Sequence, residues 1–417
     1  KRNHNYTNMA ELAFKALSFE IKGEDLQVNL LRIFYAKIPL SELNQIGPFK
    51  LIDQHTLEFT DTYQEKAEMK FSYLLSNHFD NLKNSINGNK AVYVHQNSGI
   101  PLMGNVSFGI IYRNTSLIEI KPVTSCNLNC IYCSVGEGSN SKKTDFVVEK
   151  DYLVEELRKL LKVVKEPVEI HIGVQGEPFL YADLIPLVED LYSNEQITVI
   201  SMDSNFTLVT KSQMDKLAEF KDKLRFNVSL DAMNQELAEK LAGCKYNLDY
   251  VLDMIKYAVK KEINILVAPV FIPGYNDNEL EKITAFVKEL GLEAKSKHPV
   301  LGIQNFLNYK TGRNPVRAKD WQEFYGMIND LECKIGLKQK LSATDFGIKK
   351  TIELEKPFQM GDEIKAIVKS VDRFPNSVIA VAKGRTISVP ECRFKKDKKI
   401  KVKISRDKHN VFAGKIL

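Results

Sequence analysis

The stretch LIEIKPVTSCNLNCIYC, residues 117–133, joins a short apolar strand to a loop with three cysteines. Cys126, Cys130 and Cys133 fall within eight positions of one another. Three thiolates on one short loop can hold three irons of a cubane cluster and leave the fourth iron without a protein ligand. An open coordination position of this kind is where a substrate or cofactor binds. The stretch therefore indicates a redox metal centre directly after a strand.

The surrounding sequence predicts an α/β fold around this loop. Six β-rich runs alternate with helical patterns such as those at residues 152–164, 247–260 and 278–290. The runs lie at residues 117–120, 168–172, 198–200, 225–230, 263–267 and 300–303. Strands that are each followed by a helix imply a parallel sheet, curved into a partial (β/α)6 barrel or left open. Chemistry collects at the C-terminal ends of such strands.

The chain has 417 residues, enough for two or three domains. We expect an N-terminal mixed α/β domain at residues 1–112, the partial barrel at 113–345 and a small OB-like β-barrel at 357–417. In this last segment apolar residues alternate with lysines, which predicts strands with one apolar and one basic face. We can assign no chemistry to residues 1–112.

Positive charge is concentrated in the C-terminal segment. The whole chain has 59 Lys and Arg against 53 Asp and Glu, but residues 357–417 alone hold 15 against 6. This density suits a phosphate backbone, and a merely solvated lysine face is the alternative. The candidate contacts are Lys365, Lys369, Arg385, Lys401 and Lys403.

No apolar run approaches the roughly 20 residues that a membrane-spanning helix needs, and the first residues lack a signal-type apolar core. The six cysteines suit metal ligation in a reducing compartment better than a disulfide framework. We therefore expect a cytoplasmic protein with no membrane partner.

At the cysteine loop the sequence resembles the radical S-adenosylmethionine (radical SAM) enzymes, whose motif CxxxCxxC follows the first strand of a partial barrel. The aromatic Tyr132 before the last cysteine also fits. The resemblance implies one 4Fe-4S cluster, held by the three cysteines, and SAM chelated to its free iron. In that family, reductive cleavage of SAM gives a 5′-deoxyadenosyl radical that abstracts a hydrogen atom from the substrate. An electron donor such as ferredoxin or flavodoxin is implied.

A zinc site is the alternative for the triad, but structural zinc usually has four ligands. The other cysteines, Cys244, Cys333 and Cys392, lie far apart, so they complete no such pattern. We expect each of them to be a buried, inert thiol. Methylthiotransferases of RNA carry three further cysteines upstream of the triad, and residues 1–125 contain none. One cluster is therefore expected.

Further cofactor contacts follow from the resemblance. Residues 173–178, GVQGEP, are similar to the GGE motif that receives the amino group of SAM, with glutamine in place of the first glycine. Polar residues after later strands match the regions near the SAM carboxylate and ribose, and an apolar residue matches the adenine region. The residues implied are Tyr132, Gln175, Gly176, Glu177, Asn205, Ser229, Asp231 and Ile272. A plain glycine turn at 173–176, a helix cap at Asp231 and a Pro-Gly turn at 273–274 are the structural alternatives.

Residues 357–417 resemble a TRAM domain, the small barrel appended to many RNA-modifying enzymes, through MGDEI at 360–364 and GRTISVP at 384–390. The order of barrel and tail is similar to that of archaeal-type iron-sulfur oxidoreductases. The resemblance implies a radical SAM enzyme that modifies RNA, with transfer RNA as the first choice. A peptide or small-molecule substrate, or a non-catalytic metal-containing RNA-binding protein, are the alternatives. Removal of the residues after Glu355 is expected to weaken RNA binding and to leave SAM cleavage measurable.

Overall fold

The computed structural model describes residues 9–173, 175–293, 296 and 298–417. The chain divides into two compact units: unit 1 is residues 1–93 with 142–145, and unit 2 is residues 94–141 with 146–417. Unit 2 contains both the expected partial barrel and the expected C-terminal module, so the division into three domains stays a prediction.

In the residues that the structure describes, unit 1 consists of antiparallel sheets and two α-helices, with the strand orders β1-β6-β5 and β2-β3-β4-β7. Its elements are β1 (Met9–Ala13), β2 (Leu17–Lys22), β3 (Asp25–Leu30), β4 (Phe34–Pro39), α1 (Leu40–Leu43), β5 (Phe49–Asp53), β6 (Thr56–Thr60), α2 (Gln64–Phe79) and β7 (Lys83–Asn84). Helix α2 places Phe71 against Phe14, Phe19 and Phe59, with ring centroids 5.5 to 6.4 Å apart. The mixed α/β character expected here is confirmed. The boundaries between the units fall within β8 (Ala91–Val94), between residues 141 and 142, and within β11 (Asp145–Val148).

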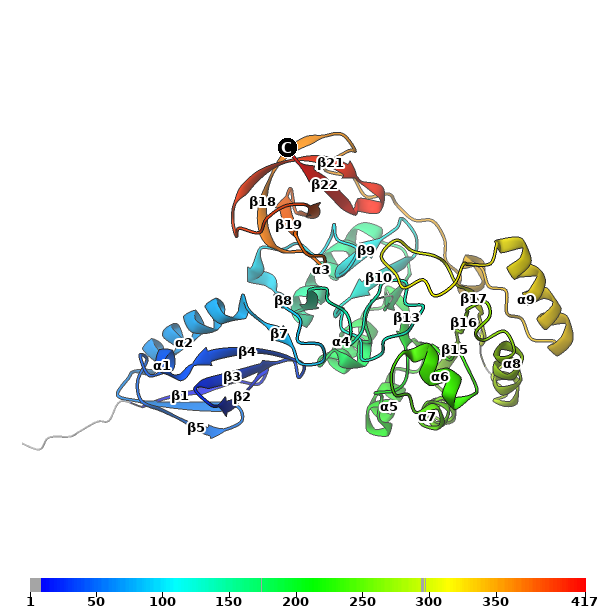
Figure 1. Ribbon diagram of the computed structural model, residues 1–417, viewed down its shortest axis with the longest axis horizontal. Helices are drawn as coiled ribbons and strands as arrows, with labels where there is room; N and C mark the ends of the chain where they lie inside the picture. Colours follow the sequence, from blue (N-terminus) through cyan, green and yellow to red (C-terminus); the bar gives the residue numbers. More distant parts are fainter. Residues whose placement is uncertain (1–8, 174, 294–295, 297) are drawn as a thin grey trace, which may run out of the picture. The chain divides into compact units, whose positions relative to one another are not determined.

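The main sheet of unit 2 has the order β15-β14-β13-β12-β10-β9 (Figure 1). Its strands are β9 (Gly109–Tyr112), β10 (Leu117–Lys121), β12 (Val168–Ile172), β13 (Ile197–Ser204), β14 (Leu224–Val228) and β15 (Asn264–Val267). The strands from β10 to β15 are parallel, and β9 is antiparallel to β10. The partial barrel is thus confirmed.

The sixth expected strand is shorter than the sequence pattern indicates. Leu301 forms a single parallel bridge with Val267, and the chain then pairs β17 (Gln304–Asn305) with β16 (Val270–Phe271). Between these pairings Gly302 lies so close to Leu341 that an added Cβ would be 2.5 Å from it. The Leu341 side chain therefore packs against Gly302, at the place where a regular strand would continue.

Helices in unit 2 follow the strands as expected. They are α3 (Lys150–Val164), α4 (Leu184–Tyr192), α5 (Lys211–Leu217), α6 (Gln235–Ala242), α7 (Leu248–Lys260), α8 (Glu279–Glu289) and α9 (Trp321–Ile335). Asn247 begins α7, because its side chain accepts a hydrogen bond from the Tyr250 N–H. Contacts of α4 with β13 and of α7 with β15 bury the apolar faces of these helices. The order of strands and helices in unit 2 therefore matches the order that the sequence pattern predicts.

The C-terminal module is a closed barrel with the order β18-β19-β20-β22-β21 (Figure 1). Its strands are β18 (Glu363–Val371), β19 (Ser377–Ala382), β20 (Arg385–Pro390), β21 (Lys399–Arg406) and β22 (Phe412–Ile416). Ala366, Val368, Val402 and Ile404 lie in its core. The lysines that alternate with them point outward, since the side chains of a strand alternate between its two faces.

Backbone hydrogen bonds fix this barrel to the rest of unit 2. The Thr386 N–H donates to the Met103 carbonyl at 3.0 Å, and the Phe412 N–H donates to the Gly104 carbonyl at 2.9 Å. Gly104 has a φ of 121°, and an added Cβ would lie 2.2 Å from the Thr386 carbonyl oxygen. Only glycine allows this close approach. Among the described residues, no helix is both long and apolar enough to cross a membrane.

Candidate active site

A cavity of about 760 Å³ opens at the C-terminal ends of the parallel strands. Most of the expected cofactor residues line it: Cys126, Cys130, Tyr132, Cys133, Gly176, Glu177, Asn205, Ser229 and Asp231. Gln175 and Ile272 do not line the cavity, but each contacts residues that do. Gln175 donates a hydrogen bond to Glu137, and Ile272 packs with Leu241 and Phe306. The fold thus brings together residues that are more than 100 positions apart in the sequence.

The cysteine loop follows β10 and is held by helix α6. The Asn129 N–H donates to the Ala242 carbonyl at 2.8 Å, and the Ile131 N–H donates to the Leu241 carbonyl at 3.0 Å. These carbonyls belong to the last turn of α6, where intrahelical partners run out. Gly243, with a φ of 65°, then turns the chain away directly beside Asn129. The end of one helix therefore sets the path of the loop on both sides of Cys130.

Arg313 fixes the other half of the loop. Its guanidinium donates to the carbonyls of Cys130 at 2.9 Å and Glu137 at 2.7 Å, and its own N–H donates to the Cys133 carbonyl at 2.9 Å. The sequence does not predict this contact, because an arginine almost 200 positions away that binds only backbone carbonyls leaves no local pattern. The loop is thus shaped by two distant segments.

The donor set of the loop suits an iron-sulfur cluster. All three cysteines are free thiols that line one cavity, and thiolates are the ligands that such clusters use. Burial is the main cause that raises the pKa of Cys126, and the neighbouring Cys130 thiol adds to it. Burial likewise raises the pKa of Cys130, and the neighbouring Cys133 adds to it. Thiolates at Cys126 and Cys130 are therefore unfavourable unless a cationic group neutralises them. The iron ions of a cluster would supply that positive charge.

Within the described residues, no three His, Cys, Asp or Glu side chains converge on a point that could hold one metal ion. A mononuclear zinc site needs its ligands around a single centre. A cubane cluster instead takes each thiolate on a different iron.

The turn at residues 175–177 packs against the cysteine loop. The Glu177 N–H donates to the Ser125 carbonyl at 2.8 Å, and a Cβ added to Gly176 would lie 2.6 Å from the same oxygen. The Glu177 carboxylate accepts bonds from Ser204 Oγ and from the Asn205 N–H, each at 2.9 Å. Burial raises the pKa of Glu177 to about 7, although these hydrogen bonds lower it. The turn thus joins the loop to the end of β13.

Tyr132 and Asp231 are paired. The Tyr132 hydroxyl donates to one oxygen of the Asp231 carboxylate, and the Val270 N–H donates to the other at 2.8 Å. Burial raises the pKa of Asp231 to about 6. Helix α6 is capped by Asn234, so Asp231 does not serve as its cap. The ribose role of Asp231 and Ser229 stays a prediction.

The remaining cofactor candidates lie as follows. Asn205 donates to the Asn127 side chain at 3.1 Å and accepts from the Thr207 N–H at 3.0 Å, which ties β13 to the cysteine loop. Ile272 packs in an apolar cluster with Leu241 and Phe306, and its carbonyl closes a turn with the Tyr275 N–H. Their roles toward SAM stay predictions.

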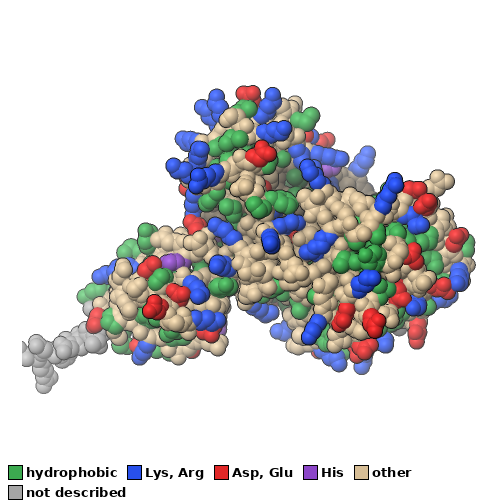
Figure 2. Space-filling view, viewed as in Figure 1, with side chains coloured by type: hydrophobic (Ala, Val, Ile, Leu, Met, Phe, Trp, Pro, Cys, Tyr) green, Lys and Arg blue, Asp and Glu red, His purple; other side chains and the backbone are tan. Residues whose placement is uncertain are grey.

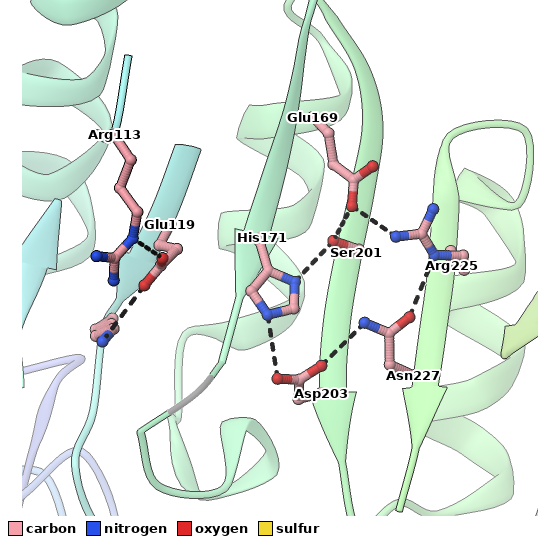
Figure 3. A network of polar contacts seen from close by, with 9 residues as sticks. Arg113, Glu119, Glu169, His171, Ser201, Asp203, Arg225 and Asn227 are labelled. Carbon is pink, nitrogen blue, oxygen red and sulfur yellow. Dashed lines mark hydrogen bonds and ion pairs between the residues drawn. The ribbon is translucent and has the colours of Figure 1, made fainter. Parts of the chain in front are cut away.

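A closed ring of polar side chains forms the floor of the cavity. It takes two residues from each of three neighbouring strands, namely Glu169 and His171 from β12, Ser201 and Asp203 from β13, and Arg225 and Asn227 from β14 (Figure 3). His171, Asp203 and Asn227 line the cavity, while the other three are buried beneath them. Each pair is two positions apart on its strand and so shares one face of the sheet.

Hydrogen bonds run around the whole ring. Ser201 Oγ donates to Glu169 Oε1, which also accepts from Arg225, both at 2.6 Å. Arg225 Nε lies 3.2 Å from Asn227 Oδ1, and Asn227 Nδ2 donates to Asp203 at 2.9 Å. His171 closes the ring, with Nδ1 2.8 Å from Ser201 Oγ and Nε2 3.1 Å from Asp203 Oδ2.

The ring determines the protonation of His171. The single hydroxyl proton of Ser201 goes to Glu169, so Ser201 can only accept from His171 Nδ1. The Asp203 carboxylate offers an acceptor to Nε2, so the ring favours the form of His171 in which both nitrogens carry protons. Burial lowers the pKa of His171, but the charge and hydrogen bond of Asp203 outweigh burial and raise it overall. The contacts of the ring therefore favour the imidazolium form of His171 at the floor of the cavity.

The cysteines outside the triad differ in their surroundings. Cys392 is buried as expected, and Cys244 is half-buried with its sulfur 4.0 Å from the Asn127 carbonyl. The expectation of burial is wrong for Cys333, which is exposed. It lies on α9, which buries only Phe324 and Ile328.

The expected basic contacts fall into two groups. Lys365, Lys401 and Lys403 are exposed on β18 and β21. Lys369 forms an ion pair with Asp397 at 2.6 Å, and Arg385 is partly buried, which lowers its pKa. Contact of these residues with RNA stays a prediction.

Comparison with known proteins agrees with this geometry. A family model described as the Radical SAM superfamily matches residues 120–287. The chain is 31% identical over 429 residues to the uncharacterized protein MJ0103 of Methanocaldococcus jannaschii, covering 95% of this chain and 97% of that relative. It is 29% identical over 182 residues to the GTP 3′,8-cyclase of Aquifex aeolicus, covering 43% of this chain and 55% of the cyclase.

Among solved structures, spore photoproduct lyase complexed with dinucleoside spore photoproduct aligns with a TM-score of 0.44 at 12% identity, over 62% of this chain and 82% of the lyase. SuiB of Streptococcus suis aligns with a TM-score of 0.41 at 12% identity, over 79% and 71%. The family model is therefore the basis of the assignment. A 4Fe-4S cluster and SAM are the cofactors that this family uses, and the chain contains a domain of the radical SAM superfamily at residues 120–287.

Proposed function

We propose that this protein is a radical SAM enzyme that modifies a nucleotide of RNA in the cytoplasm, with transfer RNA as the first candidate. When bound, the cluster and SAM supply hydrogen-atom abstraction. The protein's own residues hold these groups at the cysteine loop and leave the rest of the cavity for the substrate. An electron donor such as ferredoxin or flavodoxin completes the proposed system.

The observation that carries the proposal is the basic face of the C-terminal barrel. Lys365 and Lys401 are direct cross-strand partners on β18 and β21, and Lys403 follows on the same face. Figure 2 shows Lys and Arg side chains gathered over this barrel. Neighbouring like charges repel each other, and a bound phosphate backbone relieves that repulsion. An OB-like barrel with such a face is a common binder of single-stranded nucleic acid.

The cavity offers surfaces for an exposed base. Trp321 and Tyr325 on α9 stack with ring centroids 5.4 Å apart, and both line the cavity. Trp321 is 50% exposed. Lys340 lies 4.2 Å from the centre of the Tyr325 ring. Aromatic faces stack on any base, so a nucleotide turned out of its strand can be received here while the barrel grips the backbone.

The test compares nucleosides of RNA from cells with and without the gene by mass spectrometry. A mass difference on one nucleoside, restored by the wild-type gene, is the expected result. In parallel, RNA binding is measured against salt for Lys401→Glu/Lys403→Glu. Loss of two phosphate contacts should reduce the slope of log K against log salt by about 1.4 to 1.8.

Lys256→Glu/Lys260→Glu on α7 is the matched control, since both lysines are exposed and the change in charge is the same. Equal loss of RNA binding in both variants would refute the assigned RNA face. An unchanged nucleoside profile would refute RNA as the substrate.

A free nucleoside triphosphate is the second candidate, because GTP 3′,8-cyclases are among the relatives by sequence. In that case turnover of the free nucleotide should be the same for the Lys401→Glu/Lys403→Glu variant and the wild type. The RNA proposal instead requires turnover to fall with RNA affinity.

A further inference from the structure

An arginine of the C-terminal barrel reaches the cofactor site. Arg373 comes two residues after the end of β18, yet its side chain is only 2% exposed. Its guanidinium forms an ion pair with Glu137 of the cysteine loop, and Nη1 donates to Thr124 Oγ1 at 3.1 Å. Glu137 is 3% exposed. The pair is fully buried and joins two segments that are 236 positions apart, so the packing of both segments must hold it in place.

Glu137 connects Arg373 to the turn that is similar to the GGE motif. The second oxygen of its carboxylate accepts from the Gln175 side-chain amide. The Glu137 N–H also faces the sulfur of Cys133 at 3.4 Å, and its carbonyl accepts from Arg313. Glu137 therefore contacts the last cysteine, the C-terminal barrel and the 175–177 turn at once.

We propose that Arg373 is a positioning residue of the cofactor site, which acts through Glu137 and Gln175 to hold the 175–177 turn against the cysteine loop. The arrangement also accounts for the glutamine that replaces the first glycine of the motif at position 175. A glycine has no side-chain amide that could bond Glu137. The proposal does not depend on RNA being the substrate.

The proposal changes the expectation for removal of the C-terminal barrel. Without residues after Glu355, the Glu137 carboxylate loses its buried counterion beside the three thiols, and the contacts of residues 103–105 with the barrel are lost. Breaking a buried ion pair leaves an uncompensated charge. The truncated chain should therefore lose SAM binding as well as RNA binding, which makes point variants the better test.

The experiment uses the full chain, reconstituted anaerobically with iron and sulfide. The variants are Arg373→Lys, Arg373→Met and Arg373→Met/Glu137→Gln, the last of which leaves no unpaired buried charge. Arg393→Met is the control, since Arg393 is exposed in the same barrel. Three quantities are measured: iron per chain, SAM affinity by calorimetry, and the change that SAM causes in the electron paramagnetic resonance spectrum of the reduced cluster.

We expect the double variant to load iron as the wild type does, but to bind SAM about 10- to 100-fold more weakly, the loss typical when a partner of a metal ligand is removed. The spectral change on adding SAM should shrink in parallel. Arg373→Lys should recover part of the affinity, and Arg393→Met should match the wild type.

Wild-type SAM affinity and spectra in the loaded double variant would overturn the proposal. Should Arg373→Met fail to fold, the double variant and Arg373→Lys still decide the matter. A lower unfolding temperature with unchanged SAM affinity would also overturn it, since it would make the pair merely structural.

Discussion

Substitution of Gly243 by alanine should disturb the cysteine loop from outside the cavity. Gly243 ends helix α6 with a φ of 65°, and its N–H donates to the Glu239 carbonyl at 2.9 Å. A Cβ at this position would lie 2.3 Å from the Asn129 carbonyl oxygen. Asn129 directly precedes Cys130 in the triad, so any shift of its carbonyl moves the loop.

The cost has two parts. A non-glycine residue in the left-handed region costs about 1–2 kcal/mol. Restoring ordinary contact at 3.4 Å then requires a shift of about 1 Å between α6 and the loop, and overpacking of this kind typically costs about 1–3 kcal/mol more. Gly336 provides the matched control, because it ends α9 with a φ of 74° and an added Cβ there meets nothing within 4 Å. Gly336→Ala should show the first cost alone.

The assay records the midpoint of thermal unfolding and the iron bound per chain after anaerobic reconstitution. Gly243→Ala should unfold at a lower temperature than Gly336→Ala and bind less iron, while Gly336→Ala should load iron fully. Equal unfolding temperatures and equal iron in the two variants would refute the claim that the end of α6 sets the path of the loop.

Three further outcomes are expected. Cys126→Ser should abolish cluster loading, measured as iron and sulfide per chain, whereas Cys333→Ser on the exposed face of α9 should leave it unchanged. For His171, whose pKa is raised in the folded state, the imidazolium should stabilise the wild type relative to His171→Gln fully below about pH 6.5, the usual histidine pKa. That advantage should fade as the pH rises through the folded-state pKa, and unfolding temperatures that differ by the same amount at every pH would contradict it. Arg225→Met should lower the free energy of unfolding by about 3–5 kcal/mol, because Glu169 would keep a buried charge without its counterion; Arg225→Met/Glu169→Gln should recover much of the loss in the same denaturation assay.

The parts of the fold that depend on local pattern could be predicted. Strand and helix order, the parallel sheet and the closed C-terminal barrel follow from periodicity and from alternation of apolar residues with lysines, and the triad follows from its spacing. The polar floor also left a signal. Strands β12 and β14 each carry two polar residues at alternate positions among apolar neighbours, and β13 carries Ser201 and Asp203 at alternate positions. Read together, these pairs place polar side chains on one face of three adjacent strands.

The contacts that shape the cysteine loop could not be predicted. Arg313 and Arg373 reach it from 176 and 236 positions beyond Glu137, and each is ordinary in its own segment. The exposure of Cys333 was missed for a related reason, because burial on α9 depends on which face meets α8. Such facts depend on tertiary packing, which no local pattern encodes.

The central claim is that three thiols of one loop hold a redox cluster that cleaves SAM. The most direct measurement is of 5′-deoxyadenosine released when the anaerobically reconstituted protein is reduced in the presence of SAM. The account predicts about four irons and four sulfides per chain, and 5′-deoxyadenosine that forms with the wild type and not with Cys126→Ser. Zinc in place of iron in oxygen-free preparations, or a fully formed cluster that never yields 5′-deoxyadenosine, would contradict it.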